Sequence, residues 1–373
     1  MTKKRKIGFI INSLSSGGAE RVVTTLANNL IKTYEVSIVT FISIPPFYDL
    51  DKSIEIIHCF ETIKPSSNSF QALKSNFKLL KKMNTVVKER NIELIISFMT
   101  TANVLGVIIA RLNNIPVIIS ERTNPYFQKI PKLWNVLRII TYRYADTLVV
   151  QTETIKSFFR NKVHESKIRI LPNPISNELT NNRILNNLAY RENVILSVGR
   201  LTPLKAHAIL IKAFALTDYE NWELWIAGDG PEYKNLERLI IKLNLNKHIK
   251  LFGQVKDIHN LYNSAKIFAF SSTYEGFPNA LIEAMHFGLG CVSTDCPTGP
   301  AEVIKDGENG YLIPINNSCQ MSKKLNTLMI DESKLDVFSR KGIASVQQYE
   351  EKKVVAQWKN IINNLIDYNS GLR

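Results

Sequence analysis

Residues 6–41 read KIGFIINSLSSGGAERVVTTLANNLIKTYEVSIVTF and contain a strand, a loop, a helix and a second strand. The apolar run that follows Lys6 breaks at Asn12 and Ser13 after about five residues. It is too short for the roughly 7–15 apolar residues of a signal peptide. Apolar residues then recur at helical spacing through 20–31, and 35–41 returns to strand composition. This order predicts a unit of parallel sheet with a crossover helix.

The same alternation continues through two series that are separated by an Asn- and Pro-rich stretch at 171–193. The remaining strand-like segments are IEIIHCF (54–60), ELIISF (93–98), PVIISE (116–121), DTLVVQ (146–151), NVILSVGR (193–200), WELWIAG (222–228), IKLFGQV (249–255), KIFAFSS (266–272) and GCVSTD (290–295). We predict an α/β protein with two parallel-sheet domains, at 1–172 and 191–350, a linker at 173–190 and an amphipathic C-terminal helix at 351–373.

The composition is that of an ordinary soluble protein of two domains, with 373 residues, 45% hydrophobic and 21% charged. The longest apolar region, 103–120, is interrupted by Arg111 and Pro116, so no segment offers the roughly 20 apolar residues of a spanning helix. The formal net charge of +14 indicates an anionic partner, unless it reflects only a genome that favours Lys, Asn and Ile. The four cysteines lack CxxC spacing and predict reduced thiols in a cytosolic protein.

Two carboxylates stand on either side of a predicted helix start in SSTYEGFPNALIEAMHFGLG (271–290). Glu275 precedes the helix and Glu283 lies about five residues inside it, which places the carboxyl groups on the order of 10 Å apart. Two nearby carboxylates can indicate a glycoside hydrolase, but the catalytic pair of a retaining glycosidase is about 5 Å apart. The distance expected here excludes that function. The spacing suits two ends of one ligand whose anionic middle rests near the helix N-terminus. Two solvated surface acids are the alternative.

Loops at the carboxyl ends of predicted strands provide further candidate ligand contacts. Gly17 and Gly18 precede a helix and suit the close approach of backbone N–H groups to an anion, although the GxGxxG spacing is missing. Arg200 and Lys205 follow the strand at 193–198 and suit either a diphosphate leaving group or a solvated surface pair. A turn at 228–230 is expected to have a structural role with a minor ligand contact. No grouped carboxylates indicate a metal site; Asp49 and Asp51 are interpreted as a coincidence.

The segment at 69–91 predicts a basic amphipathic helix. Its apolar positions, Leu73, Phe77, Leu80 and Met83, alternate with cations, so it suits either an anionic bilayer or an ordinary core-facing role. The cations, which are the candidate membrane contacts, are Lys74, Lys78, Lys81, Lys82, Lys88 and Arg90. A second basic segment at 129–146 adds Trp134, Tyr142 and Arg143.

Together these motifs resemble the family-4 retaining glycosyltransferases of the GT-B fold. The resemblance is carried by SSGGAERVV, SVGRLTPLK, AGDGPEY, LFGQV and YEGFPNALIEAMHFG in this order, and it covers almost the whole chain. SGGAERV with ISERTNP is similar to bacterial enzymes that extend lipid-linked oligosaccharides, including the N-acetylgalactosamine transferases of protein glycosylation. The resemblance implies two Rossmann-like domains facing a cleft, with the C-terminal helix crossing back to the first domain.

The resemblance also implies roles for individual residues. Arg200 and Lys205 would hold the donor diphosphate, Glu275 the sugar hydroxyls, and Glu283 the ribose. Gly17 and Gly18 would close over the donor. Val255 would flank the base, and the helix start would supply backbone donors from Gly276, Phe277, Pro278 and Asn279. Where some relatives have a histidine on the acceptor side, this chain has Glu121 and Arg122, which become the acceptor-side candidates. Ala206 stands where relatives often have glycine.

The predicted activity is transfer of a hexose or N-acetylhexosamine, with GalNAc as the best guess, from a UDP-sugar to a polyprenyl-diphosphate-linked oligosaccharide. The enzyme would form an α-linkage with retention and without a metal or cofactor, in surface polysaccharide or glycoprotein glycan assembly. It would lie in the cytoplasm against the inner face of the cytoplasmic membrane. A GT-B sugar-nucleotide epimerase or a phosphorylase is the alternative enzyme. A nucleic-acid binder is suggested only by charge, and no nucleic-acid motif supports it.

Overall fold

The computed structural model describes residues 4–62, 69–185 and 190–371, which form two compact units. The first unit comprises Met1–Pro174 together with Glu351–Arg373, and the second comprises Ile175–Glu350. Residues near the start of the expected linker belong to the second unit, because Ile175 and Leu179 are buried in its core.

The first unit is built on a seven-stranded sheet in the order β3-β2-β1-β4-β5-β6-β7. Each pair of neighbouring strands is parallel. The order reverses direction between β1 and β4, which lie side by side. The strands are β1 (Lys6–Ile11), β2 (Glu35–Ile42), β3 (Glu55–Phe60), β4 (Leu94–Phe98), β5 (Val117–Ser120), β6 (Thr147–Val150) and β7 (Ile168–Ile170).

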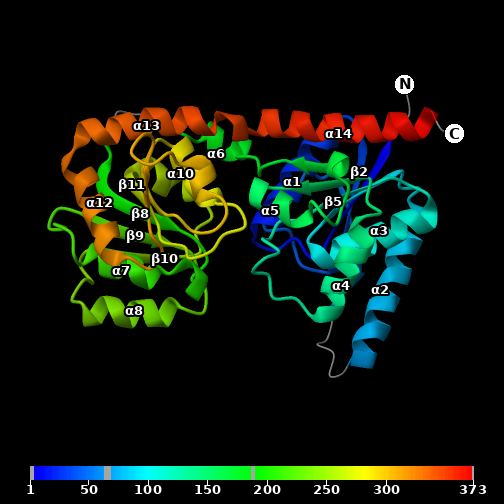
Figure 1. Cartoon of the computed structure of the whole chain (residues 1–373), viewed down its shortest axis with the longest axis horizontal. Coiled ribbons are helices and arrows are strands. Elements are labelled where there is room, and N and C mark those ends of the chain that lie inside the picture. The colour runs from blue at the N-terminus through cyan, green and yellow to red at the C-terminus, as the bar shows by residue number, and fades with distance from the viewer. Residues whose placement is uncertain (1–3, 63–68, 186–189, 372–373) are drawn as a thin grey trace. The chain divides into compact units, whose positions relative to one another are not determined.

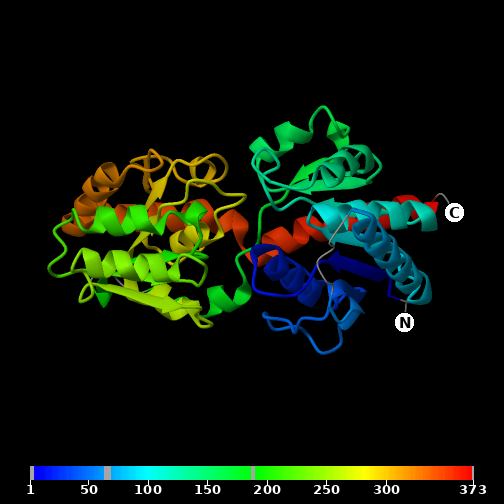
Figure 2. The ribbon, with the colours of Figure 1, turned by 90° about the horizontal axis from the view of Figure 1, so that it is seen from below.

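Helices cover both faces of this sheet. On one face lie α2 (Ser69–Glu89), α3 (Thr100–Asn113), α4 (Lys132–Tyr142) and α5 (Glu153–Phe159), packed over one hydrophobic cluster. On the other face lie α1 (Gly18–Leu30) and α14 (Glu351–Gly371). Figures 1 and 2 both show red α14 beside the blue N-terminal elements. Although α14 follows the second unit in the chain, its apolar face completes the core of the first.

The second unit contains a six-stranded sheet in the order β10-β9-β8-β11-β12-β13, also with parallel neighbours. Its order reverses between β8 and β11. The strands are β8 (Glu192–Val198), β9 (Glu223–Ala227), β10 (Ile249–Gly253), β11 (Ala265–Phe270), β12 (Gly290–Thr294) and β13 (Tyr311–Ile313). The helices are α6 (Asn177–Asn181), α7 (His207–Phe214), α8 (Tyr233–Lys242), α9 (Ile258–Ser264), α10 (Asn279–His286), α11 (Pro300–Val303), α12 (Ser318–Ile330) and α13 (Glu332–Val346).

The prediction of two parallel-sheet α/β domains and a C-terminal helix on the first domain is confirmed. The strands β7 and β13 were not predicted, because each has only three residues and gives little periodic signal. Across the described ranges, no helix combines the length and apolarity needed to cross a bilayer. Cys59, Cys291 and Cys296 are buried free thiols, and Cys319 is exposed.

Candidate active site

The strongest candidate site lies at the point where the strand order of the second sheet reverses. The adjacent parallel strands β8 and β11 end there, and each is followed by a loop that carries predicted site residues. The loop after β8 contains Arg200 and Lys205, and the loop after β11 contains Glu275. Ligands of open α/β sheets bind at such positions, outside the carboxyl ends of the strands.

The structure brings Lys205 and Glu275 together although they are far apart in the chain. Lys205 Nζ lies 2.5 Å from Glu275 Oε1. Glu275 is buried, whereas the Arg200 side chain is exposed and makes no hydrogen bond or ion pair within the described part of the chain. The loop therefore presents a free guanidinium beside a lysine that the buried carboxylate orients, an arrangement suited to an anionic ligand that also carries hydroxyls.

Hydroxyl groups fix the turn that carries Glu275. Ser271 Oγ donates to Lys205 O at 2.8 Å, and the Thr273 N–H donates to Leu204 O at 2.8 Å. On the other side, Thr298 Oγ1 donates to Glu275 O. These bonds tie the loop after β11 to the cation loop, so the Lys205–Glu275 geometry is built by backbone contacts as well as by the ion pair.

The glycine turn at 228–230 supports the cation loop by close backbone packing. Gly228 has φ +147°, and a Cβ added there would lie 1.9 Å from Gly199 O. A Cβ at Gly230 would lie 2.4 Å from Leu201 O. In addition, the Leu201 N–H donates to Asp229 O at 2.9 Å. Only glycine permits this approach, which assigns the turn the structural role that the sequence suggested.

Glu283 is the fifth residue of α10 and is buried. Its Oε2 accepts a hydrogen bond from Tyr262 Oη at 3.0 Å. Pro278 is the residue at the N-terminal cap of α10, and Asn279 is the first helical residue. Phe277 points into the core, where its ring meets that of Tyr349 edge-on at 5.8 Å. Gly276 and Phe277 can therefore offer backbone groups at the helix start, but the Phe277 side chain is structural.

Val255 lies just beyond β10 and is partly buried against the core of the second unit. Its position on the same rim as the cation loop is consistent with a flanking contact to a ligand, because β10 is parallel to β9 and β9 to β8.

In the first unit, Gly17 and Gly18 form the start of α1 at the carboxyl end of β1. A Cβ on Gly17 would lie 2.2 Å from Glu20 Oε2, so a larger residue would displace that carboxylate. Gly18 is exposed in the first turn of α1. This turn follows β1, the strand at which the order of the first sheet reverses. This loop occupies in the first unit the place that the cation loop occupies in the second.

The acceptor-side candidate Glu121 follows β5 but is fully buried. Its carboxylate accepts hydrogen bonds from Tyr142 Oη at 2.8 Å, Thr123 Oγ1 at 3.0 Å and Thr100 Oγ1 at 3.2 Å. Burial raises the pKa of this carboxyl above its ordinary value, against the opposing effect of the Arg138 charge. With its oxygens occupied inside the domain, Glu121 holds the turn after β5 rather than facing solvent.

Arg122 is also buried, and its guanidinium lies close to two aromatic rings that stack on each other. Its carbon Cζ is 5.1 Å from the centroid of Phe98 and 5.8 Å from that of Trp358 on α14. Nη1 donates to Asn173 Oδ1 at 2.6 Å, while Nε and Nη2 have no partner among the described residues. Burial lowers the pKa of Arg122 to about 9, so it stays cationic at neutral pH.

The predicted basic helix corresponds to α2, and five of its cations are exposed, namely Lys74, Lys78, Lys81, Lys82 and Lys88. The sixth, Arg90, lies just past the end of α2 and is exposed as well, but its Nη2 lies 2.6 Å from Glu55 Oε1, so it fastens the end of α2 to β3. Met83 is in the core, whereas Leu73 and Phe77 are 60% and 68% exposed. The first half of α2 thus presents both cations and apolar groups to solvent.

Sequence reasoning missed several residues of the second-unit site. Thr298 supports Glu275, and the turn signal in PTGP (297–300) was available to indicate it. Tyr262 supports Glu283, but nothing in its local sequence distinguishes it from a core aromatic. Cys296 lies near the ion pair: burial raises the pKa of its thiol to about 12, with a further contribution from the Glu275 charge.

Comparison with known proteins fits this geometry. The model of the Glycosyltransferase Family 4 matches residues 16–179, and that of the Glycosyl transferases group 1 matches residues 180–345. A GalNAc-α-(1→4)-GalNAc-α-(1→3)-diNAcBac-PP-undecaprenol α-1,4-N-acetyl-D-galactosaminyltransferase of Campylobacter jejuni is 31% identical over 365 residues, or 96% of this chain and 98% of that protein. The chain is a family-4 glycosyltransferase.

A second relative of this glycosyltransferase, also from Campylobacter jejuni, is an N-acetylgalactosamine-N,N'-diacetylbacillosaminyl-diphospho-undecaprenol 4-α-N-acetylgalactosaminyltransferase. It is 30% identical over 360 residues, which is 94% of this chain and 97% of the relative. The fold is similar to that of Anabaena HepE in complex with UDP, with a TM-score of 0.79 and 20% identity over 96% of this chain and 100% of that one. The expected GT-B fold is confirmed, and the epimerase alternative finds no support.

Proposed function

We propose that this glycosyltransferase moves GalNAc from UDP-GalNAc to a polyprenyl-diphosphate-linked oligosaccharide, forming an α-linkage with retention of configuration. The observation that carries the proposal is the Lys205–Glu275 pair at the point where the second sheet reverses its strand order. The choice of sugar and acceptor is supported by the names of the two Campylobacter jejuni relatives, both of which are GalNAc transferases acting on undecaprenyl-linked glycans.

The donor would bind across the loops of the second unit. Arg200 and Lys205 would hold the diphosphate and stabilise the negative charge that develops as UDP leaves. Glu275, now paired with Lys205, would accept hydrogen bonds from hydroxyls of the sugar. Glu283, whose carboxylate Tyr262 Oη holds by a hydrogen bond, would receive the ribose hydroxyls. Val255 would flank the base.

We propose retention of configuration and metal independence together with this assignment. Two cations at the diphosphate perform the charge neutralisation for which other transferases employ a divalent ion, so we propose that no metal is required. The acceptor hydroxyl would attack from the face that UDP leaves, and the departing diphosphate oxygen would accept its proton. Gly17 and Gly18 would offer backbone N–H groups to an anion at the start of α1.

The acceptor lipid accounts for the basic first unit. We propose that the enzyme lies peripherally on the inner face of the cytoplasmic membrane, with the five exposed lysines of α2 facing anionic lipid. Arg90 is left out of this contact because it is paired with Glu55. Glu121 and Arg122 would shape the acceptor side through the turn after β5.

The test is transfer from a panel of UDP-, GDP- and ADP-sugars in the presence of EDTA, with membranes that contain lipid-linked oligosaccharide. We expect UDP release from UDP-GalNAc that depends on the lipid acceptor. Glu275→Ala should lower transfer at least about 100-fold without loss of folding, because the interaction it removes is made in the active site. Glu237→Ala, which alters an exposed carboxylate on α8, is the matched control and should transfer normally.

Transfer at the wild-type rate by Glu275→Ala would contradict the site. Loss of all activity in EDTA, with recovery on addition of a divalent metal, would contradict metal independence. A product with inverted configuration, measured by the anomeric coupling constant in NMR, would contradict retention while leaving the donor site intact.

A further inference from the structure

The helix α4 exposes an apolar face that the core does not use. Its inner face buries Arg138 and Tyr142, whereas Leu133, Val136 and Ile140 are 55%, 52% and 46% exposed. Tyr144, just beyond the helix, is 54% exposed. These four residues, the α4 stripe, are spaced by three, four and four positions and therefore lie on one side. Surface helices of soluble proteins are normally polar on that side.

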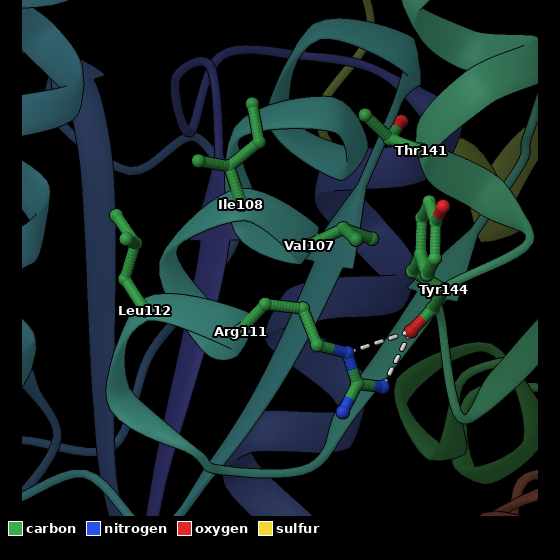
Figure 3. A pocket seen from close by; sticks show the side chains of 6 residues that line it. All are labelled: Val107, Ile108, Arg111, Leu112, Thr141 and Tyr144. Carbon is green, nitrogen blue, oxygen red and sulfur yellow. Dashed lines mark hydrogen bonds between the residues drawn. The ribbon is translucent and has the colours of Figure 1, made fainter.

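The α4 stripe continues into a shallow apolar groove between α3 and α4. The groove has a volume of about 430 Å³ and is lined by Val107, Ile108, Arg111, Leu112, Thr141 and Tyr144. Figure 3 shows the aliphatic side chains of α3 on one side and Tyr144 on the other. The Arg111 side chain closes one end, since its Nε donates to Tyr144 O at 2.9 Å and its Nη2 lies 2.8 Å from Asp146 Oδ1. Leu112, which is 63% exposed, leaves the groove open to the outside.

Cations predominate around this apolar surface, and Asp146, the acid at its edge, is ion-paired with Arg111. Lys129, Lys132 and Arg143 are exposed at the two ends of α4. No aspartate or glutamate occurs between residues 122 and 145, and none occurs in α3. The neighbouring helix α2 adds its exposed lysines on the same face of the sheet and has no acidic residue before its last, Glu89.

An exposed apolar surface can bind a second copy of the chain or a membrane, and the charges around it favour one of these two partners. In a two-fold dimer through this face, the cations around the apolar surface of one copy would face the same cations of the other copy. The repulsion between these like charges would disfavour the dimer. An anionic bilayer matches both parts of the surface. Its headgroups attract the surrounding cations, and the apolar residues can insert at the boundary between headgroups and acyl chains, as those of interfacial helices do.

We propose that the α4 stripe and the α3–α4 groove form a lipid-contact surface that inserts into the headgroup–acyl boundary of an anionic bilayer. The sequence suggested Trp134 and Tyr142 for membrane contact in this segment, but Tyr142 is fully buried and bonded to Glu121, and Trp134 is partly buried. This proposal rests on the membrane association proposed above and extends it to a second helix. The α4 stripe adds an apolar contribution to membrane binding that salt does not screen.

The experiment is co-sedimentation of the full chain with vesicles of phosphatidylglycerol and phosphatidylcholine, and with phosphatidylcholine alone. Leu133→Ser, Val136→Ser and Ile140→Ser are combined in one variant. We expect this variant to bind anionic vesicles at least tenfold more weakly than wild type, and the residual binding to be abolished by high salt. The control Ile330→Ser, an exposed apolar residue on α12, should bind as wild type does.

A second measurement does not depend on the triple variant folding. Val136→Cys in a Cys319→Ser background, labelled with an environment-sensitive fluorophore, should shift to shorter emission wavelengths on anionic vesicles. Unchanged vesicle binding by the triple variant, or a label that stays in a water-like environment, would overturn the proposal. A wild-type dimer that the triple variant converts to monomer, with vesicle binding unchanged, would overturn it in favour of self-association. Failure of the proposed function appears separately, as wild-type enzyme that binds vesicles but transfers no sugar.

Discussion

Replacing Trp358 tests the role of the C-terminal helix in the first domain. Trp358 lies on α14, is fully buried, and stacks on Phe98 with ring centroids 5.9 Å apart. Truncating a buried Trp to Ala costs about 3–5 kcal/mol through lost transfer energy and the remaining cavity. The indole Nε1 has no hydrogen-bond partner in the described ranges, so no hydrogen bond is lost with it. We therefore expect a loss near the lower limit, about 3 kcal/mol.

The assay is hydrogen exchange in the native state, followed peptide by peptide by mass spectrometry. Trp358→Ala should accelerate exchange in the strands of the first unit, where α14 packs, by about 100-fold for 3 kcal/mol. The strands of the second unit should change little. Gln357→Ala, at the exposed neighbouring position, should stay within about 0.5 kcal/mol of wild type.

Trp358→Phe separates packing from the indole N–H. The ring that meets Phe98 and the Arg122 guanidinium is largely kept, and the unpartnered donor is removed. This variant should lose clearly less than Trp358→Ala. If Trp358→Ala leaves exchange in the first unit unchanged, the reasoning that α14 completes its core is refuted.

Two further predictions concern the second unit. Gly228→Ala should lower donor affinity and transfer at least tenfold, since its Cβ would lie 1.9 Å from Gly199 O and displace the cation loop. Gly307→Ala, which also has positive φ but no atom within 4 Å of the added Cβ, should transfer normally, and equal activities of the two variants would contradict this reasoning. His286 has its pKa lowered to about 4 by burial and secondarily by the Arg183 charge, so the folded state holds it neutral. Because its pKa in the unfolded chain is about 6.5, the free energy of unfolding should fall as the pH drops from about 6.5 toward 4, by on the order of 1–2 kcal/mol at pH 5. Urea unfolding at pH 7 and pH 5 measures this fall, which should be smaller for His286→Gln; an equal fall in both proteins would show that other groups cause it.

The sequence by itself determined the layers of the fold and the positions of the donor-site loops relative to their own strands and helix. Alternating apolar strands and amphipathic helices are properties of neighbouring residues, so they predicted two parallel-sheet domains. The start of α10 between Glu275 and Glu283 was also readable, because proline at its beginning and glycine after its end are local signals. The spacing of the cation loop relative to its strand required no tertiary information.

The tertiary structure decided which side chains meet. The Lys205–Glu275 pair depends on the adjacency of β8 and β11, and the Arg90–Glu55 pair on the packing of α2 beside β3. Periodicity shows that a helix has an apolar face, but α4 is apolar on two sides, and only packing shows that Leu133 faces outward while Tyr142 is buried. The same holds for Trp358: periodicity shows only that its helix is amphipathic, and in the folded chain Trp358 fills the core of the first domain. Hydrophobic burial is non-directional, so the sequence specifies how much apolar surface must be covered, and the assembled fold selects what covers it.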